Sequence, residues 1–121
     1  MNISILRHGT AEDKGTKPDA ERRLTKEGER ELRAVLRLAR KAGIKPALIL
    51  TSPLIRAVET ARIAEAELGS KNIAETKALL PAVAPAQVWK EIRSHHDAGE
   101  IMLVGHEPQL SRIAGFLLES P

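Results

Sequence analysis

The chain has 121 residues, of which 42% are apolar and 29% charged, and its formal net charge is +3. This length fits one domain over residues 1–121, and the absence of cysteine excludes disulfides, a thiolate nucleophile and cysteine-based metal sites. One Trp, one Phe and no Tyr are too few for a base-stacking surface, so we expect no nucleic acid partner. No apolar run approaches the roughly 20 residues that span a bilayer, so we expect no membrane partner and a cytoplasmic location.

Short apolar runs alternate along the chain with stretches of helical periodicity. The first run, residues 3–7, predicts a buried strand, and a polar loop follows over residues 10–24. A helix is expected to begin after Thr25 as its N-cap and to reach Ala42, where Gly43 supplies a C-terminal stop.

The middle of the chain repeats this order of strand and helix. Residues 47–50 form a continuous apolar run, which is typical of a buried parallel strand. Ser52 and Pro53 are expected to cap and open a second helix that ends at Gly69. A weaker extended segment is expected over residues 73–80.

The last third predicts a helix over residues 86–98, a strong strand over residues 101–104 and a final helix after Pro108. This alternation predicts an α/β fold, a three-layer α/β/α sandwich with a mainly parallel central sheet. The chain stops at Pro121, directly after the last expected helix, so we expect a C-terminal part of such a fold to be missing.

Residues suited to phosphate follow three of the predicted strands. Arg7 and His8 end the first strand, and His106 follows the last one. Arg56 lies in the first turn of the helix after the second strand, where free backbone N–H groups favour an anion. Because parallel strands end on the same edge of a sheet, these four side chains are expected to converge in one pocket. A guanidinium binds phosphate through paired hydrogen bonds, and an imidazole can attack phosphorus.

The segments around these residues resemble those of a known family, and they occur in the same order. They are Leu6-Arg7-His8-Gly9, Asp19 with Arg22 to Gly28, Ser52 to Ala61, and Val104 to Pro108. Together they resemble the signature of the histidine phosphatase superfamily, which has the phosphoglycerate mutase-like fold. The compact chain leaves no room for a cap domain and is most similar to the SixA-type branch, the phosphohistidine phosphatases.

The resemblance implies that His8 is the nucleophile and forms a covalent phosphohistidine, while Arg7, Arg56 and His106 bind the phosphoryl oxygens. It implies a phosphatase that needs no metal and no cofactor. Positioning and electrostatic stabilisation are what phosphoryl transfer mainly requires, so the residue types agree with this role. His8 must be neutral to attack, with its other ring nitrogen fixed by a hydrogen bond, whereas His106 is expected to act as a cation.

Further residues could belong to the pocket. Arg22 could touch the phosphoryl group or the substrate, but a loop salt bridge explains it equally well. Thr10 and Ser52 could line the pocket, although helix capping also explains Ser52.

The resemblance also implies a carboxylic acid near residues 80–85 that protonates the leaving oxygen, yet this segment contains no acid. Its absence favours a P–N substrate, because a nitrogen leaving group can be protonated from solvent. Glu107 or Glu12 could supply the acid instead. We therefore expect a phosphohistidine phosphatase that acts on a phosphoprotein. The alternatives are a broad-specificity phosphomonoesterase acting on small phosphorylated substrates, or a non-catalytic phosphate-binding module.

Three other features have simpler structural explanations. The arginines of the first helix alternate with glutamates, which is typical of a solvated face. His95 and His96 point in different directions on a helix, so we expect no metal site there. Trp89 is expected to pack at least partly against the core.

Overall fold

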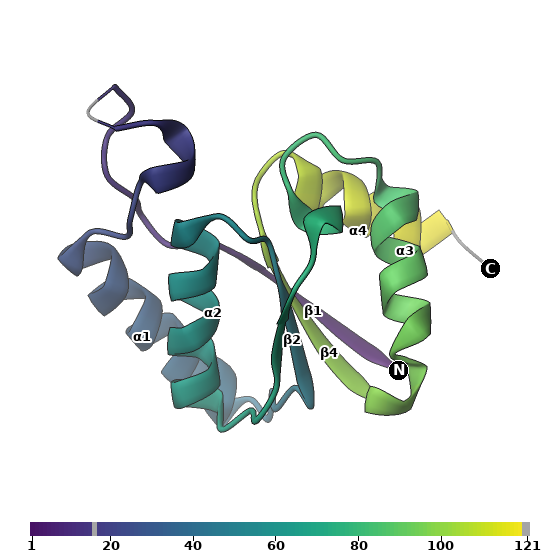
Figure 1. Cartoon of the computed structure of the whole chain (residues 1–121). Helices are drawn as coiled ribbons and strands as arrows, with labels where there is room; N and C mark the ends of the chain where they lie inside the picture. The colour runs from purple at the N-terminus through teal and green to yellow at the C-terminus, as the bar shows by residue number, and fades with distance from the viewer. Residues whose placement is uncertain (16, 120–121) are drawn as a thin grey trace.

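The computed structural model describes residues 1–15 and 17–119. Within this part of the chain, four parallel strands form one sheet in the order β1-β4-β2-β3. The strands are β1 (Asn2–Arg7), β2 (Leu48–Thr51), β3 (Ile73–Glu75) and β4 (Glu100–Gly105). The helices are α1 (Lys26–Lys41), α2 (Ile55–Leu68), α3 (Pro85–Ser94) and α4 (Gln109–Glu119). Helices α1 and α2 cover one face of the sheet and α3 and α4 the other (Figure 1), which confirms the three-layer α/β prediction.

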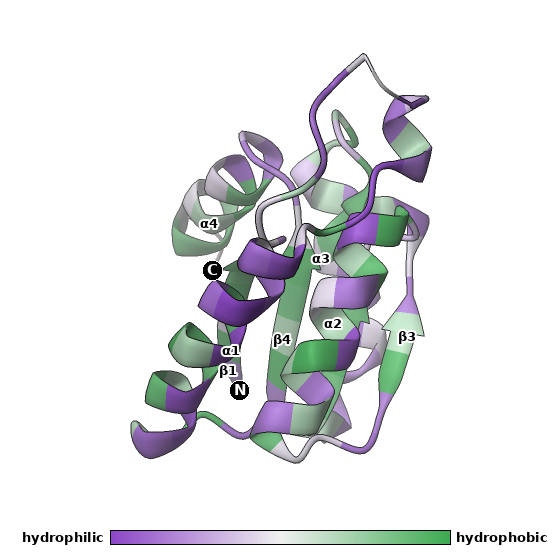
Figure 2. Ribbon diagram, turned by 90° about the vertical axis from the view of Figure 1, so that its left-hand side faces the viewer, coloured by the Kyte–Doolittle hydropathy of each residue, from purple (hydrophilic) through white to green (hydrophobic). Residues whose placement is uncertain are grey.

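The central strands supply two apolar cores, one on each face of the sheet. Ile49 and Met102 pack on the side of α1 and α2, whereas Leu50 and Leu103 pack on the side of α3 and α4. Because successive side chains of a strand point to opposite faces, a strand between two helical layers is apolar throughout. Figure 2 shows this for β4, which is green along most of its length. Trp89 is partly buried against the second core, as expected.

The predicted start and stop signals of α1 and α2 agree with the structure at three of four ends. The Thr25 side chain accepts a hydrogen bond from the Gly28 backbone N–H at 2.9 Å and caps α1, which ends at Lys41. Gly69 ends α2 with a left-handed backbone, φ +73°. The start of α2 was predicted wrongly, because Leu54 and not Ser52 is its N-cap.

Ser52 is held by the sheet and not by the helix. Its backbone N–H donates to the Val104 carbonyl at 3.0 Å, which continues the pairing of β2 with β4. Its hydroxyl accepts the Leu54 N–H at 3.3 Å. This hydrogen bond holds a short turn between the end of β2 and the start of α2.

Two other predicted elements are shorter in the structure. Only Ile73–Glu75 of the extended segment is a strand, because the Thr76 side chain caps a 3₁₀ turn over Lys77–Leu79. The helix expected over residues 86–98 is α3, which ends at Ser94 and is followed by a 3₁₀ turn over His96–Ala98. Within the described residues, no helix is both long and apolar enough to cross a bilayer.

Gly28 allows the N-terminus of α1 to lie directly against the loop that follows β1. The Thr25 N–H donates to the Thr10 carbonyl at 2.9 Å, and a Cβ at Gly28 would collide with that same carbonyl oxygen. The glycine therefore fixes how closely α1 approaches the residues next to His8.

We expect Gly28→Ala to lower the free energy of unfolding by about 1–3 kcal/mol, the usual range for overpacking, because the obstructing atom belongs to the backbone. Urea unfolding followed by circular dichroism measures this change. Gly115→Ala is the matched control, since Gly115 also lies in a helix but has open space around it. The control should be neutral or stabilising by up to about 1 kcal/mol. Equal effects of the two substitutions would contradict the close approach.

Candidate active site

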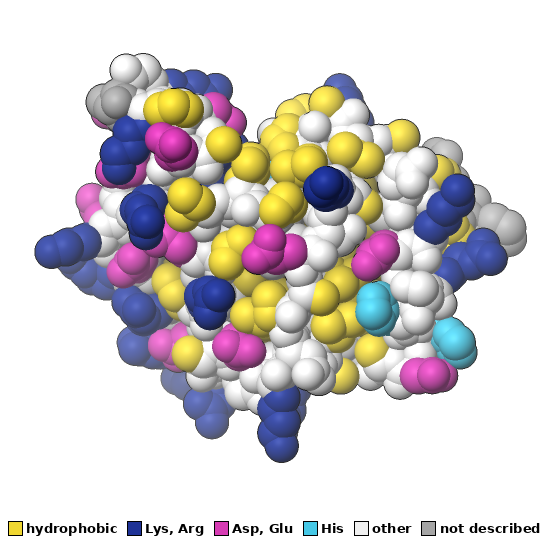
Figure 3. Space-filling view, in the orientation of Figure 1, with side chains coloured by type: hydrophobic (Ala, Val, Ile, Leu, Met, Phe, Trp, Pro, Cys, Tyr) yellow, Lys and Arg dark blue, Asp and Glu magenta, His cyan; other side chains and the backbone are white. Residues whose placement is uncertain are grey.

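A cavity of about 700 Å³ opens at the carboxyl ends of β1 and β4. Its lining includes six residues predicted from the sequence, namely Arg7, His8, Thr10, Arg22, Arg56 and His106, but not Ser52. Figure 3 shows the molecule hollowed at the top, between the lobe formed by the loop after β1 and the rest of the surface. The expected convergence of three strand ends is therefore present in the fold.

His8 is half-buried in this cavity and is held by one of its ring nitrogens. Its Nδ1 lies 2.7 Å from the Gly9 carbonyl oxygen, an acceptor only, so Nδ1 carries the proton. Burial, and then the positive charges of Arg56 and Arg7, lower the pKa of His8. The ring is consequently neutral near pH 7 and presents an unprotonated Nε2.

A hydrogen bond to a side chain of helix α2 fixes the position of Gly9. The Gly9 N–H donates to the Thr60 hydroxyl at 3.1 Å, and that hydroxyl donates to the Arg56 carbonyl at 2.8 Å. Thr60 is fully buried. The acceptor that orients His8 is thus tied to the helix that carries Arg56.

His106 is buried beside His8, with 5.1 Å between the ring centroids. Its Nε2 lies 2.8 Å from the Ser52 hydroxyl, and its buried Nδ1 has no hydrogen-bond partner among the described residues. Burial, and then the neighbouring His8 and Arg56, lower the pKa of His106 to about 4. The expectation of a cationic His106 was therefore wrong for the free protein, because the ring is buried and lies near the positive charge of Arg56.

Arg56 is only 4% exposed and points its guanidinium at Asp19. Its two terminal nitrogens donate to the Asp19 carbonyl oxygen at 2.8 Å and to the Asp19 carboxylate at 3.2 Å. The Arg56 Nε is buried and has no partner among the described residues. Arg56 and His106 both line the cavity, and each has one buried nitrogen without a partner among the described residues.

Asp19 also pairs with Arg22, whose Nη2 lies 3.0 Å from the carboxylate. Burial raises the pKa of Asp19, but Arg56 and Arg22 together bring it below its ordinary value. Arg22 further donates to the Glu12 carbonyl at 2.7 Å. Arg22 therefore forms the expected loop salt bridge and also lines the cavity, while its contact with a phosphoryl group stays a prediction.

Asp19 is the site residue that sequence reasoning missed. It was recognised only as part of the segment leading into α1, since a lone acid in a polar loop carries no signal of its partners. An acid three residues before a site arginine is the one clue, because that spacing allows the Asp19–Arg22 pair.

The two glutamates considered as acids differ in position. Glu107 lines the cavity, where the Ser111 side chain and backbone donate to its carboxylate and lower its pKa. Glu12 is not among the lining residues and pairs with Lys17 at 3.0 Å. From residues 80–85 only Pro81 lines the cavity, so that segment contributes no proton.

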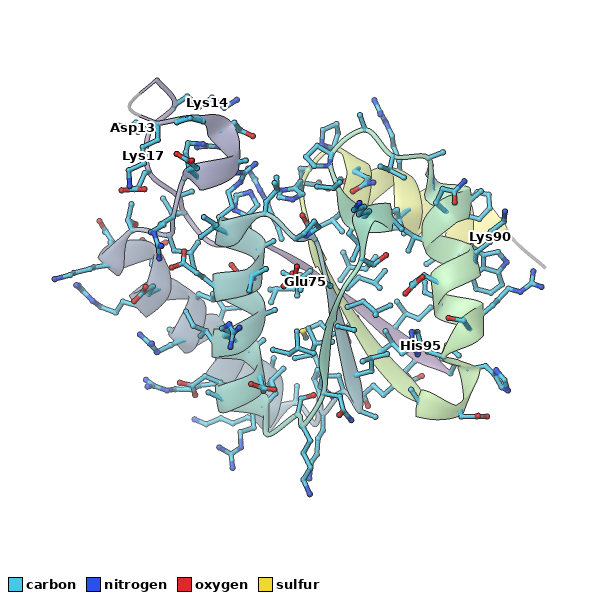
Figure 4. The ribbon with its side chains drawn as sticks, viewed as in Figure 1. Asp13, Lys14, Lys17, Glu75, Lys90 and His95 are labelled. Carbon is cyan, nitrogen blue, oxygen red and sulfur yellow. The ribbon has the colours of Figure 1, made fainter. Side chains whose placement is uncertain are left out.

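Charged groups elsewhere have local explanations. Figure 4 shows His95 at the foot of α3, near the opposite end of the sheet, whereas Lys14, on the loop after β1, lines the cavity. His95 pairs with Glu91 at 3.7 Å, and no group of three or more potential metal ligands occurs among the described residues. Basic side chains gather over α1 (Figure 3), where Arg33 pairs with Glu29 at 3.9 Å.

Comparison with known proteins agrees with this geometry. Residues 3–80 match the histidine phosphatase superfamily (branch 1). The chain belongs to this family. It is 34% identical over 117 residues to an uncharacterized protein of Picosynechococcus sp. strain PCC 7002, covering 94% of this chain and 71% of that protein.

Solved structures share the fold at lower identity. The protein histidine phosphatase SixA complexed with tungstate superposes with a TM-score of 0.87 and 21% identity, covering 95% of this chain and 75% of that chain. A mycobacterial glucosyl-3-phosphoglycerate phosphatase superposes with a TM-score of 0.74 and 18% identity, covering 97% and 79%. The phosphoglycerate mutase-like fold is therefore established, whereas these structures differ in the substrates they are named for.

We expect acid to destabilise the fold through His106. The unfolded chain binds this proton near pH 6.5 and the folded chain only near pH 4, so stability is full above pH 6.5 and declines as the pH falls toward 4. The loss is at most about 3 kcal/mol. Urea unfolding at pH 7.5 and 4.5 measures it, and His106→Gln should flatten the slope. His96→Gln, an exposed control, should leave the slope unchanged; an equal slope in all three proteins would contradict the assignment.

Proposed function

We propose that the protein is a phosphohistidine phosphatase that works through a covalent phosphohistidine on His8. The observation that carries this proposal is the hydrogen bond between His8 Nδ1 and the Gly9 carbonyl. It leaves Nε2 as an unprotonated nucleophile in a cavity lined by Arg7, Arg22 and Arg56. Membership of a phosphatase superfamily supports hydrolysis of a phosphorylated substrate.

In the first step the Nε2 lone pair of His8 attacks phosphorus, and the bond from phosphorus to the substrate nitrogen breaks. The departing nitrogen takes its proton from solvent. Arg7, Arg56 and His106 would hold the phosphoryl oxygens, where fixed donors stabilise the spread charge of the transition state. In the second step water attacks phosphorus, its proton passes to solvent, and inorganic phosphate leaves as the P–N bond to His8 breaks.

Two of the three carboxylates that line the cavity support a P–N substrate over a phosphate ester. Asp19 is bound to two arginines and Glu107 to Ser111, and both pKa values are lowered, so both are ionised near neutral pH. An alkoxide leaving group needs a proton donor, whose absence costs about 10²–10⁴-fold, but an amine leaving group can do without one. We therefore infer a phosphohistidine of a phosphoprotein as the substrate.

The proposed reaction requires no metal or cofactor, because the three arginines supply the positive charge. A cytoplasmic location is part of the proposal, and the cysteine-free sequence is compatible with a reducing compartment.

A small-molecule phosphomonoesterase is the second candidate. Glu31 on α1 also lines the cavity and has no hydrogen-bond or ion-pair partner among the described residues, so it could donate a proton to an ester oxygen. The similarity in fold to a mycobacterial glucosyl-3-phosphoglycerate phosphatase agrees with this possibility. A third candidate, a phosphate-binding module without catalysis, would form no covalent intermediate.

We expect incubation with phosphohistidine peptide and EDTA to yield acid-labile, base-stable phosphate on His8, detected by trapping and mass spectrometry. His8→Ala should form none and should lose turnover, because the substitution removes the proposed nucleophile. His96→Gln, an exposed histidine outside the cavity, should behave as the unmodified protein. Retained turnover in His8→Ala would overturn the mechanism, and activity that depends on a metal would overturn the charge assignment.

We expect kcat/KM for a phosphohistidine peptide to exceed that for p-nitrobenzyl phosphate by about 10² or more, because ionised Asp19 and Glu107 cannot protonate the ester oxygen. Steady-state release of phosphate measures both. The reverse preference, abolished by Glu31→Gln, would establish the esterase and refute the phosphohistidine substrate.

A further inference from the structure

The two histidines of the cavity are held at opposite ring nitrogens. His8 is bound through Nδ1, which leaves Nε2 free to act, whereas His106 is bound through Nε2, and its buried Nδ1 has no hydrogen-bond partner among the described residues. The partner of His106 is the hydroxyl of Ser52, a residue that is fully buried and 54 positions away in sequence. The sequence left this serine as either a cap or a pocket residue, and the structure supports neither role.

The direction of the Ser52–His106 hydrogen bond follows from the other contacts of the serine. The Ser52 oxygen already accepts the Leu54 N–H at 3.3 Å, and it has one proton to give. If that proton goes to His106 Nε2, only the His106 Nδ1–H lacks a partner among the described residues. The reverse direction would leave both the hydroxyl proton and the Nδ1 lone pair unpaired in a buried place, which costs more.

A phosphoryl group needs donors, since its oxygens only accept hydrogen bonds. The unpartnered Nδ1 of His106 must therefore carry a proton if this ring is to bind a phosphoryl group. A neutral Nδ1–H ring satisfies that need without adding charge beside Arg56 and His8, and Asp19, which faces the same site, is already neutralised by Arg56 and Arg22. A cationic ring would instead be repelled by the neighbouring guanidinium.

We propose that Ser52 is a positioning residue: its hydroxyl donates to His106 Nε2 and holds the ring as the Nδ1–H tautomer. The neutral ring then donates a hydrogen bond from Nδ1 to the phosphoryl group in transfer. This inference rests on the proposed function, because it assigns His106 a role in the same reaction. It also explains why a serine held by the sheet, and not a helix cap, follows β2.

The tautomer can be read directly in the free, ¹⁵N-labelled full chain at pH 7.5. Two-bond ¹H–¹⁵N correlation spectra distinguish a protonated ring nitrogen from a bare one, and His106→Gln assigns the signals. We expect His106 to have a protonated Nδ1 and a bare Nε2. A ring protonated at Nε2, or at both nitrogens, would overturn the proposal whether or not any variant folds.

Ser52→Ala provides the second measurement. We expect it to populate the Nε2–H tautomer of His106 and to slow phosphoenzyme formation on His8 by about tenfold, the factor for one lost hydrogen bond of about 1.4 kcal/mol. KM should change less than kcat, since Ser52 does not touch the substrate. Ser70→Ala is the matched control, because the Ser70 hydroxyl is buried but has no hydrogen-bond partner among the described residues.

The control should leave the His106 signals and the rate unchanged. A Ser52→Ala protein with the original tautomer and an unchanged rate would refute the positioning role. The outcomes also separate the two proposals. A protein that forms no phosphohistidine would refute the proposed function, whereas the tautomer is measured without any substrate.

Discussion

The parallel pairing of β1 with β4 is the constraint on which the site depends. The register runs from Asn2 opposite Glu100 to Arg7 opposite Gly105, and the His8 N–H continues it by donating to the Gly105 carbonyl at 3.1 Å. Both strands therefore end at the same level, and the next residue of each is a histidine. A slip of one residue would turn each side chain to the other face of the sheet and separate the two rings.

The cavity combines fixed positive charge with neutral imidazoles. Arginine remains charged in any protein environment, so Arg7 and Arg56 keep their charge near the buried rings. The same burial and the same charges depress the pKa values of His8 and His106. The charged arginines can therefore neutralise a phosphate, while the uncharged imidazole rings can attack phosphorus or donate a hydrogen bond. Asp19 holds the Arg56 guanidinium in place before a ligand arrives.

Much of the fold could be predicted because its signals are local. The cap at Thr25, the left-handed Gly69 and the apolar runs of the central strands depend on a few neighbouring residues. The error at Ser52 has the opposite origin. Serine followed by proline is a common helix start, but here the sheet binds the serine backbone through Val104, a contact between residues distant in sequence. Arg7, His8, Arg56 and His106 could be predicted to converge, because parallel strands end on one edge.

The sequence by itself determined the order of elements, the family and which residue types meet at the cavity. Periodicity, helix caps and motifs each depend on residues that lie close together in the sequence. Only the tertiary structure decided the state of those residues. The neutral His106, the partner of its Nε2 and the place of Asp19 between two arginines depend on burial and on hydrogen bonds across tens of residues. Burial and distance arise only when the chain has folded, and they set the protonation on which the chemistry depends.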